Sequence, residues 1–407
     1  MLNHTKISTV SSAIIVSLFV QFLFVDYVIG FMTDSKHDRM MNNAVRREVA
    51  EKNTKARDLY MTRGNNDVIH RERDVTSKQV SSSSSPAPAP CPTDCRCFYP
   101  KHWRLILDCI GHIGHTNARS LSREINAYLP SVAWNITQLT IQYTSLTAVP
   151  ESICQMKRLT QLALFFNRLI TSLPDNCFIR LQQLKFFRAS LCGLTSLQAG
   201  LFDNLANLQS VDLSHNKISS IDAYLFDNLT NLQRVDLSGN QISFIEAHLF
   251  DNLINLRSVD LSYNHISSID VHLFDNSANL EGVRLSSNQI SSIDAHQFDI
   301  TANLPNLRYI DLSYNHLTEI DTWPVKRAQL INGSIIDLSN NHISRFTNSL
   351  GWHYDCNSPR LLSHLIDLTK NNITHLDDLF RGWNITGLFF CIHTARYRLV
   401  VSTTSPP

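Results

Sequence analysis

The sequence predicts a solenoid, in which short strands stack coil upon coil into one parallel sheet. Two observations lead to this prediction. Residues 208–298 repeat the pattern LxxLxLxxNxL four times with its asparagines 24 residues apart, and phenylalanines recur at the same spacing. A constant period of this length is typical of solenoids, because each repeat can bury its apolar face only against its neighbours. The phenylalanines are Phe202, Phe226, Phe250, Phe274 and Phe298.

Each repeat is expected to begin with a strand and to turn at an asparagine. In the phrase VDLS, the apolar residues Val211 and Leu213 alternate with polar ones, which is the two-residue period of a half-buried strand. A buried asparagine amide can satisfy backbone groups of its own turn and of the next, so stacked asparagines form a ladder. Thr144 and Cys192 hold this position in two early repeats, which brings the count to about ten. The predicted ladder asparagines are Asn167, Asn216, Asn240, Asn264, Asn288, Asn315, Asn341 and Asn371.

The repeats resemble those of extracellular leucine-rich repeat proteins, and the segment CPTDCRC resembles their cysteine-rich N-terminal cap. The resemblance extends over roughly residues 91–380. It implies an α/β solenoid, the leucine-rich repeat horseshoe, with a parallel concave β-sheet, about ten repeats and a disulfide-bonded N-terminal cap. It also implies that the concave face binds other proteins, and that Cys91 pairs with Cys97 and Cys95 with Cys109. The phrase FDNLxNL is similar to repeats of variable lymphocyte receptors and Toll-like ectodomains.

Five further cysteines lie outside this cap. Cys154 and Cys177 fall at similar places in adjacent repeats, which predicts a disulfide; the alternative is that both fill the apolar core. Cys192 is expected to be a buried, unreactive ladder residue. Cys356 and Cys391 are expected to form one bridge in a reduced C-terminal cap. Without that bridge the last coil would need another cover, such as a partner subunit.

The rest of the chain divides by composition. Residues 1–30 contain an uncharged run and are predicted to be a signal peptide. The alternative is an uncleaved signal anchor over residues 8–31, which would give a type II protein of the plasma membrane. Residues 31–90 carry dense mixed charge and end in SSSSSPAPAP, so we expect a disordered linker. The remaining predicted domains are the cysteine-rich cap 91–135, the repeats 136–380 and an atypical C-terminal cap or tail 381–407.

The composition argues against several functions. The net charge is +1, so no general attraction to nucleic acid or to membranes is expected. The motifs GxSxG, HExxH, GxGxxG and the P-loop are absent from the sequence, so we expect no enzyme, no cofactor and no metal. Histidines at the repeat spacing, such as His248 and His272, are expected to face solvent. The alternative is a column that binds a metal or senses pH.

The outward positions of the strands are the candidate ligand-binding residues. One interpretation is that their aspartates are the solvated default of this repeat; the other is an acidic strip for a basic partner, interrupted by Arg284. The column consists of Asp212, Asp236, Asp260, Arg284, Asp311 and Asp337, and the candidate aromatic anchors are Tyr263 and Tyr314. The candidate glycosylation sites are Asn135, Asn228, Asn332, Asn372 and Asn384.

These observations predict a secreted, extracellular recognition protein that binds a protein or glycoprotein ligand on its concave face. The family resemblance implies innate immune recognition, cell adhesion or a receptor–ligand role. Two alternatives are a non-catalytic structural subunit of a secreted complex, and the membrane-tethered adhesion molecule described above.

Overall fold

The computed structural model describes residues 91–92, 95–98, 105–110, 117–174, 176–294, 297–298, 304–321, 335–347, 364–373 and 397–400. The chain divides into two units, Met1–Pro86 and Ala87–Pro407, and all described residues belong to the second. Within them, no helix combines the length and the apolar run that a membrane crossing requires. The predicted signal peptide or anchor, the linker and most of the C-terminal cap lie outside the described residues, as do Cys356, Cys391, Asn332 and Asn384.

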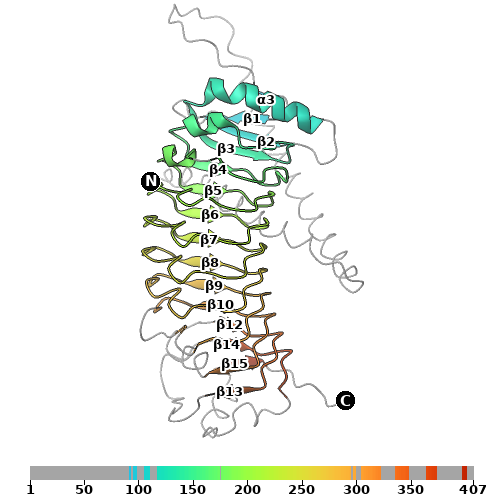
Figure 1. The fold of residues 1–407 in the computed structure, drawn as a ribbon, viewed down its shortest axis with the longest axis vertical. Coiled ribbons are helices and arrows are strands. Elements are labelled where there is room, and N and C mark those ends of the chain that lie inside the picture. The colour runs from blue at the N-terminus through green and yellow to red at the C-terminus, as the bar shows by residue number, and fades with distance from the viewer. Residues whose placement is uncertain are drawn as a thin grey trace, which may run out of the picture. The chain divides into compact units, whose positions relative to one another are not determined.

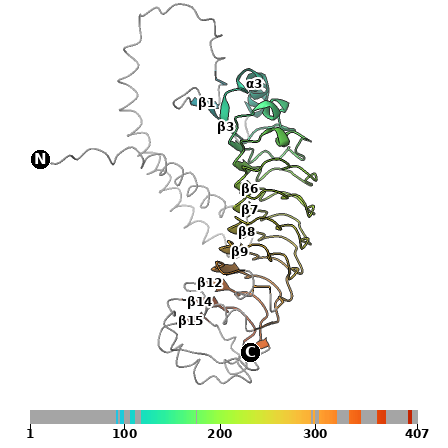
Figure 2. The same cartoon turned by 90° about the vertical axis from the view of Figure 1, so that its left-hand side faces the viewer.

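Thirteen of the described strands form one sheet, in which they follow one another in chain order (Figure 1). The first pair is antiparallel and every later pair is parallel. The sheet lies along the concave side of the stacked coils, and the return segments lie along the other side (Figure 2). The strands are β1 (Cys95–Phe98), β2 (Leu105–Ile110), β3 (Ile136–Gln142), β4 (Gln161–Ala163), β5 (Phe186–Arg188), β6 (Ser210–Asp212), β7 (Arg234–Asp236), β8 (Ser258–Asp260), β9 (Gly282–Arg284), β10 (Tyr309–Asp311), β12 (Ile335–Asp337), β14 (His364–Asp367) and β15 (Tyr397–Val400).

Further elements lie outside this sheet. β11 (Glu319–Asp321) and β13 (Arg345–Thr347) form a separate two-stranded parallel sheet, and the return segments include the 3₁₀ turns η1 (Glu151–Gln155) and η2 (Phe178–Arg180). The helix α3 (Asn117–Val132) was not predicted from the sequence.

Helix α3 covers the N-terminal end of the coils. Ile125, Leu129 and Val132 are buried in the same apolar cluster as β2 and β3. Their spacing of four and then three residues places them on one face of a helix. The first coil has no preceding coil to cover it, and this helical face supplies apolar cover there.

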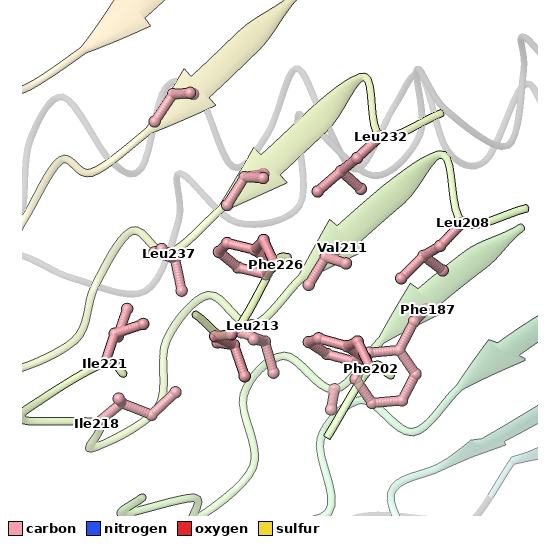
Figure 3. Close-up of a cluster of buried hydrophobic side chains, with 14 of the residues drawn as sticks. Phe187, Phe202, Leu208, Val211, Leu213, Ile218, Ile221, Phe226, Leu232 and Leu237 are labelled. Atoms are coloured by element: carbon pink, nitrogen blue, oxygen red, sulfur yellow. The ribbon is translucent and has the colours of Figure 1, made fainter. Parts of the chain in front are cut away.

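The core lies between the sheet and the return segments (Figure 3). Successive phenylalanine rings from Phe202 to Phe298 stack with centroids 5.8–6.4 Å apart. The predicted solenoid with a parallel concave sheet is therefore confirmed. Among the described residues the regular turns number about seven, slightly fewer than expected from the sequence, because the repeats toward both ends depart from the constant period.

The asparagine ladder closes the turns. The amide nitrogen of Asn240 donates to the carbonyl oxygens of Leu213 and Leu237 at 3.1 and 2.9 Å, and its amide oxygen accepts from the N–H of Ile218 at 3.1 Å. These backbone groups would otherwise be buried without partners, so the ladder stabilises each turn and ties it to the one before. The same three bonds recur at Asn216, Asn264, Asn288, Asn315, Asn341 and Asn371.

A second column of asparagines precedes the strands and was missed in the sequence analysis. Its members are exposed or half-buried, and each donates to a backbone carbonyl of the preceding repeat at 2.7–3.0 Å. The signal was present in the sequence, because these residues stand in the phrase xNL before each strand. The column consists of Asn207, Asn231, Asn255, Asn279 and Asn306.

Disulfides hold the N-terminal part of the solenoid. Three are present among the described residues, and they join the pairs that the sequence analysis expected. Cys192 is free and buried; its thiol donates to the carbonyl oxygen of Leu164 at 2.7 Å, and burial raises its pKa to about 11. It is therefore an unreactive residue of the ladder. The disulfides are Cys91–Cys97, Cys95–Cys109 and Cys154–Cys177.

Candidate functional site

The predicted aspartate column lies on the outward face of the sheet. Asp212, Asp236 and Asp260 are in register on β6, β7 and β8. Each accepts two hydrogen bonds through its Oδ1 atom, from the N–H and the hydroxyl of the serine two residues later. Asp311 makes both bonds too, and Asp337 makes the backbone one. One carboxylate oxygen thus fixes the turn after the strand; at Asp236 the other oxygen has no hydrogen-bond or ion-pair partner among the described residues.

Two arginines flank these three aspartates. The Nε atom of Arg188 lies 2.7 Å from Oδ2 of Asp212, and a guanidinium nitrogen of Arg284 lies 3.7 Å from Oδ2 of Asp260. Asp236 stands between them and makes no ion pair within the described part of the chain. Arg284 was predicted to interrupt the column, whereas Arg188 was missed although it holds the same strand position in the repeat LKFFRAS.

The carboxyl group of Asp236 has a pKa raised to about 7. Burial is the largest cause, and the negative charges of Asp212 and Asp260 add to it, while the hydrogen bonds from Ser238 act in the opposite direction. Near neutral pH both protonation states of Asp236 are therefore populated. A cation brought beside this group would favour the ionised state.

The imidazole of His215 lies over Gly239, next to the strip. Both residues have positive φ angles, +54° and +64°, and a Cβ atom on Gly239 would overlap Nδ1 of the imidazole. Burial lowers the pKa of His215; the charges of Asp212 and Asp260 oppose this effect, and Arg188 contributes to it. His215 is therefore neutral near pH 7. Its Nδ1 atom is buried and has no hydrogen-bond partner in the described structure.

The predicted aromatic anchors stand in the turns that follow the strands. Tyr263 and Tyr314 are 61% and 55% exposed, and their φ angles are +56° and +54°. The ladder fixes this backbone, and a tyrosine side chain has only two torsions to order on binding, which favours its use as an anchor. The same turn position holds Tyr143 and Phe166 in the first repeats, where the two rings stack 4.4 Å apart.

The histidines of the repeats lie in the return segments and in the turns. His248 and His272 each pair with an aspartate three residues later, at 2.9 and 2.8 Å. The hydrogen bond and the charge of Asp275 raise the pKa of His272. Among the described residues, no three histidine, cysteine or acidic side chains gather as metal ligands.

Three of the predicted glycosylation sites fall on described residues. Asn228 and Asn372 are exposed, and Asn228 lies in a return segment, away from the sheet. Asn135 is only 5% exposed, and its amide oxygen is buried. The folded chain therefore favours the first two as glycan acceptors.

Comparison with known proteins bears on the repeats. The profile of the Leucine rich repeat family matches residues 190–242, 206–266, 230–290 and 254–317. No curated protein matches the sequence.

Many solved structures align with the chain, including the following three. An internalin, InlF, from Listeria monocytogenes is 19% identical over 69% of this chain and 71% of that one, with a TM-score of 0.47. Toll from Drosophila, in its complex with Spatzle, is 18% identical over 68% of this chain and 44% of that one, with a TM-score of 0.48. The leucine-rich repeat domain of APL1B is 18% identical over 72% of this chain and 74% of that one, with a TM-score of 0.47. The matched residues therefore carry leucine-rich repeats, and the stacked parallel coils, the asparagine ladder and the disulfide-bonded N-terminal cap together form a leucine-rich repeat solenoid.

Proposed function

We propose that this protein is a secreted recognition protein that binds another protein on the outward face of its sheet. In this proposal, a basic side chain of the partner lies against an acidic strip formed by Asp212, Asp236 and Asp260. One observation carries it: three carboxylates stand in register on adjacent strands, and the central one has no counter-ion within the described residues. Strands in a sheet lie about 4.8 Å apart. The carboxylates therefore repel one another, and a lysine or arginine would relieve that repulsion.

The disulfides support an extracellular place of action. Cytosolic thiols are kept reduced, whereas disulfides persist in secreted proteins. Two of the three disulfides close the N-terminal cap, and the third joins neighbouring return segments. Together with the predicted signal peptide, they favour a role in innate immune recognition, cell adhesion or receptor–ligand binding.

The mechanism is complementarity of shape and charge, without catalysis. A basic partner would displace the proton that Asp236 holds below about pH 7, so affinity is expected to rise with pH through that range. Tyr263, exposed in the turn after β8, offers an aromatic contact to the same partner.

Capture of partners from the native extracellular fluid tests this function. The bait proteins are the wild type, Asp236→Lys and Asp260→Lys, with Glu246→Lys as control. The control makes the same charge change at an exposed position of a return segment. We expect each strip variant to lose roughly tenfold or more of the captured partner, since like charges facing each other cost several kcal/mol. The control should capture as much as the wild type.

Two results would count against this function. Equal capture by the wild type and both strip variants would show that the aspartates do not bind the partner. If light scattering shows the same stoichiometric complex for the wild type and for both strip variants, the protein would instead be favoured as a non-catalytic structural subunit.

A further inference from the structure

A shallow depression of about 400 Å³ lies on the same face of the sheet, over β7 to β10. Gly282 lines it and pairs with Ser258 on one side and with Tyr309 on the other. Glycine has no side chain, so the outward row of residues is interrupted between these two neighbours. The depression is thus produced by one glycine in register with larger residues.

Arginines dominate the lining. Arg234, Arg257 and Arg284 line it, against one acidic residue, Glu281. Arg257 pairs with Glu281 at 2.9 Å, and both side chains are more than half exposed. Arg234 makes no ion pair within the described residues. The depression therefore carries an excess of positive charge.

Arg284 is held in place from two sides. Its guanidinium carbon lies 5.1 Å from the centroid of the Tyr309 ring, and one of its nitrogens lies 3.7 Å from Oδ2 of Asp260. When a guanidinium group stacks on an aromatic ring, its N–H groups can still donate hydrogen bonds in the plane of the guanidinium. A guanidinium group oriented in this way matches the two oxygens of a carboxylate.

We propose that the depression binds a carboxylate side chain of the protein partner, while a neighbouring basic residue of that partner contacts the acidic strip. This inference rests on the proposed function. Arg234 and Asp236 are the first and last residues of the three-residue strand β7 and both face outward, so their positions are separated by roughly 7 Å. A single segment carrying both charges can reach the two sites at once.

The adjoining aspartates argue for a polypeptide over a sulfated polysaccharide. A polyanion carries like charge along its whole length, so a chain lying in the depression would also meet Asp236 and Asp260. Like charges brought together at an interface cost several kcal/mol. A polypeptide segment with one acidic and one basic side chain fits both sites without that penalty.

Synthetic peptides of equal length provide the test. One carries glutamate and lysine separated by spacers of glycine and serine; in the second, serine replaces every lysine, and in the third, serine replaces every glutamate. A heparin-derived oligosaccharide is the polyanion arm. Binding is measured by fluorescence anisotropy on the full chain at one ionic strength, because surface electrostatics depends on salt.

Variants assign the binding to the depression or to the strip. Gly282→Phe fills the depression, and the backbone accepts it, because an added Cβ would meet its nearest neighbour, the Cβ of Tyr309, at 3.7 Å. Arg234→Glu reverses one charge of the lining, and Asp236→Lys reverses one charge of the strip. Arg158→Glu is the control, because it makes the same charge reversal as Arg234→Glu at an exposed residue outside the sheet. Thermal melts confirm that each variant is folded.

We expect the mixed peptide to bind the wild type roughly tenfold or more tightly than either single-charge peptide. Gly282→Phe, Arg234→Glu and Asp236→Lys should each weaken it by a similar factor, and Arg158→Glu should not. Tighter binding of the glutamate-only peptide or of the oligosaccharide would overturn the inference, as would the absence of any binding. If Asp236→Lys alone abolishes binding, the depression is not a site, and the proposed function stands without it.

Discussion

Replacing Asp236 with asparagine tests whether the acidic strip destabilises the fold when it is ionised. The asparagine oxygen can still accept the hydrogen bonds that Ser238 donates to Asp236, so the turn is kept and the charge is lost. In the wild type, the carboxyl group becomes ionised between Asp212 and Asp260 as the pH rises through about 7. The variant is therefore expected to be more stable than the wild type in mildly alkaline solution.

The size of the effect follows from the pKa. The folded-state pKa of Asp236 is about 7, against an ordinary value of 3.8, so folding favours the protonated form. The stability that this group contributes is fully present below pH 3.8 and is lost as the pH rises through 7. At about 1.4 kcal/mol for each tenfold change in proton affinity, the upper bound is about 4 kcal/mol over the whole range, of which about 3 kcal/mol is lost above about pH 5. Solvent screening on this partly exposed face reduces the effect, and we expect about 1–2 kcal/mol.

Urea unfolding at about pH 5 and about pH 8.5, with the disulfides intact, measures this difference. From the lower to the higher pH, the free energy of unfolding of Asp236→Asn should increase by about 1–2 kcal/mol relative to that of the wild type. Asp311→Asn is the matched control, because Asp311 holds the same strand position and the same bonds to a serine, and it should follow the wild type. If the wild type and Asp236→Asn change in parallel with pH, the reasoning about stacked carboxylates is wrong.

Four further variants have clear expected outcomes in urea unfolding. Gly239→Ala should lower the free energy of unfolding by about 1–3 kcal/mol, because Gly239 has a left-handed backbone conformation and the added Cβ would overlap the imidazole of His215. Gly282→Ala should leave the free energy of unfolding nearly unchanged. Asn264→Ala leaves one N–H and two carbonyl groups buried without partners and should cost about 2–4 kcal/mol; a smaller loss would mean that water replaces the amide. Replacing Cys154 and Cys177 with alanine should lower the free energy of unfolding by about 3 kcal/mol. Reducing agent should then cause no further loss of stability from this disulfide.

The stacked coils could be predicted from the sequence because their cause is local and repeated. An apolar residue at every second position, an asparagine after each strand and a phenylalanine at the same period specify one coil, and repetition specifies the stack. Helix α3 was not predicted because its apolar residues occur once, outside the repeats, in the segment predicted to be a cysteine-rich cap. The second asparagine column was missed because its role depends on reaching the preceding coil.

The amino-acid sequence by itself determined the solenoid, its ladder and the position of the outward aspartates, since these depend on the period alone. The tertiary structure decided which aspartate lacks a counter-ion, because Arg188 and Arg284 lie on strands far from Asp236 in the chain but close to it in the sheet. It also decided that Gly282 opens a depression, which requires the strands on both sides in register. Charge and shape on this face arise from neighbours across strands, and stacking brings those neighbours together.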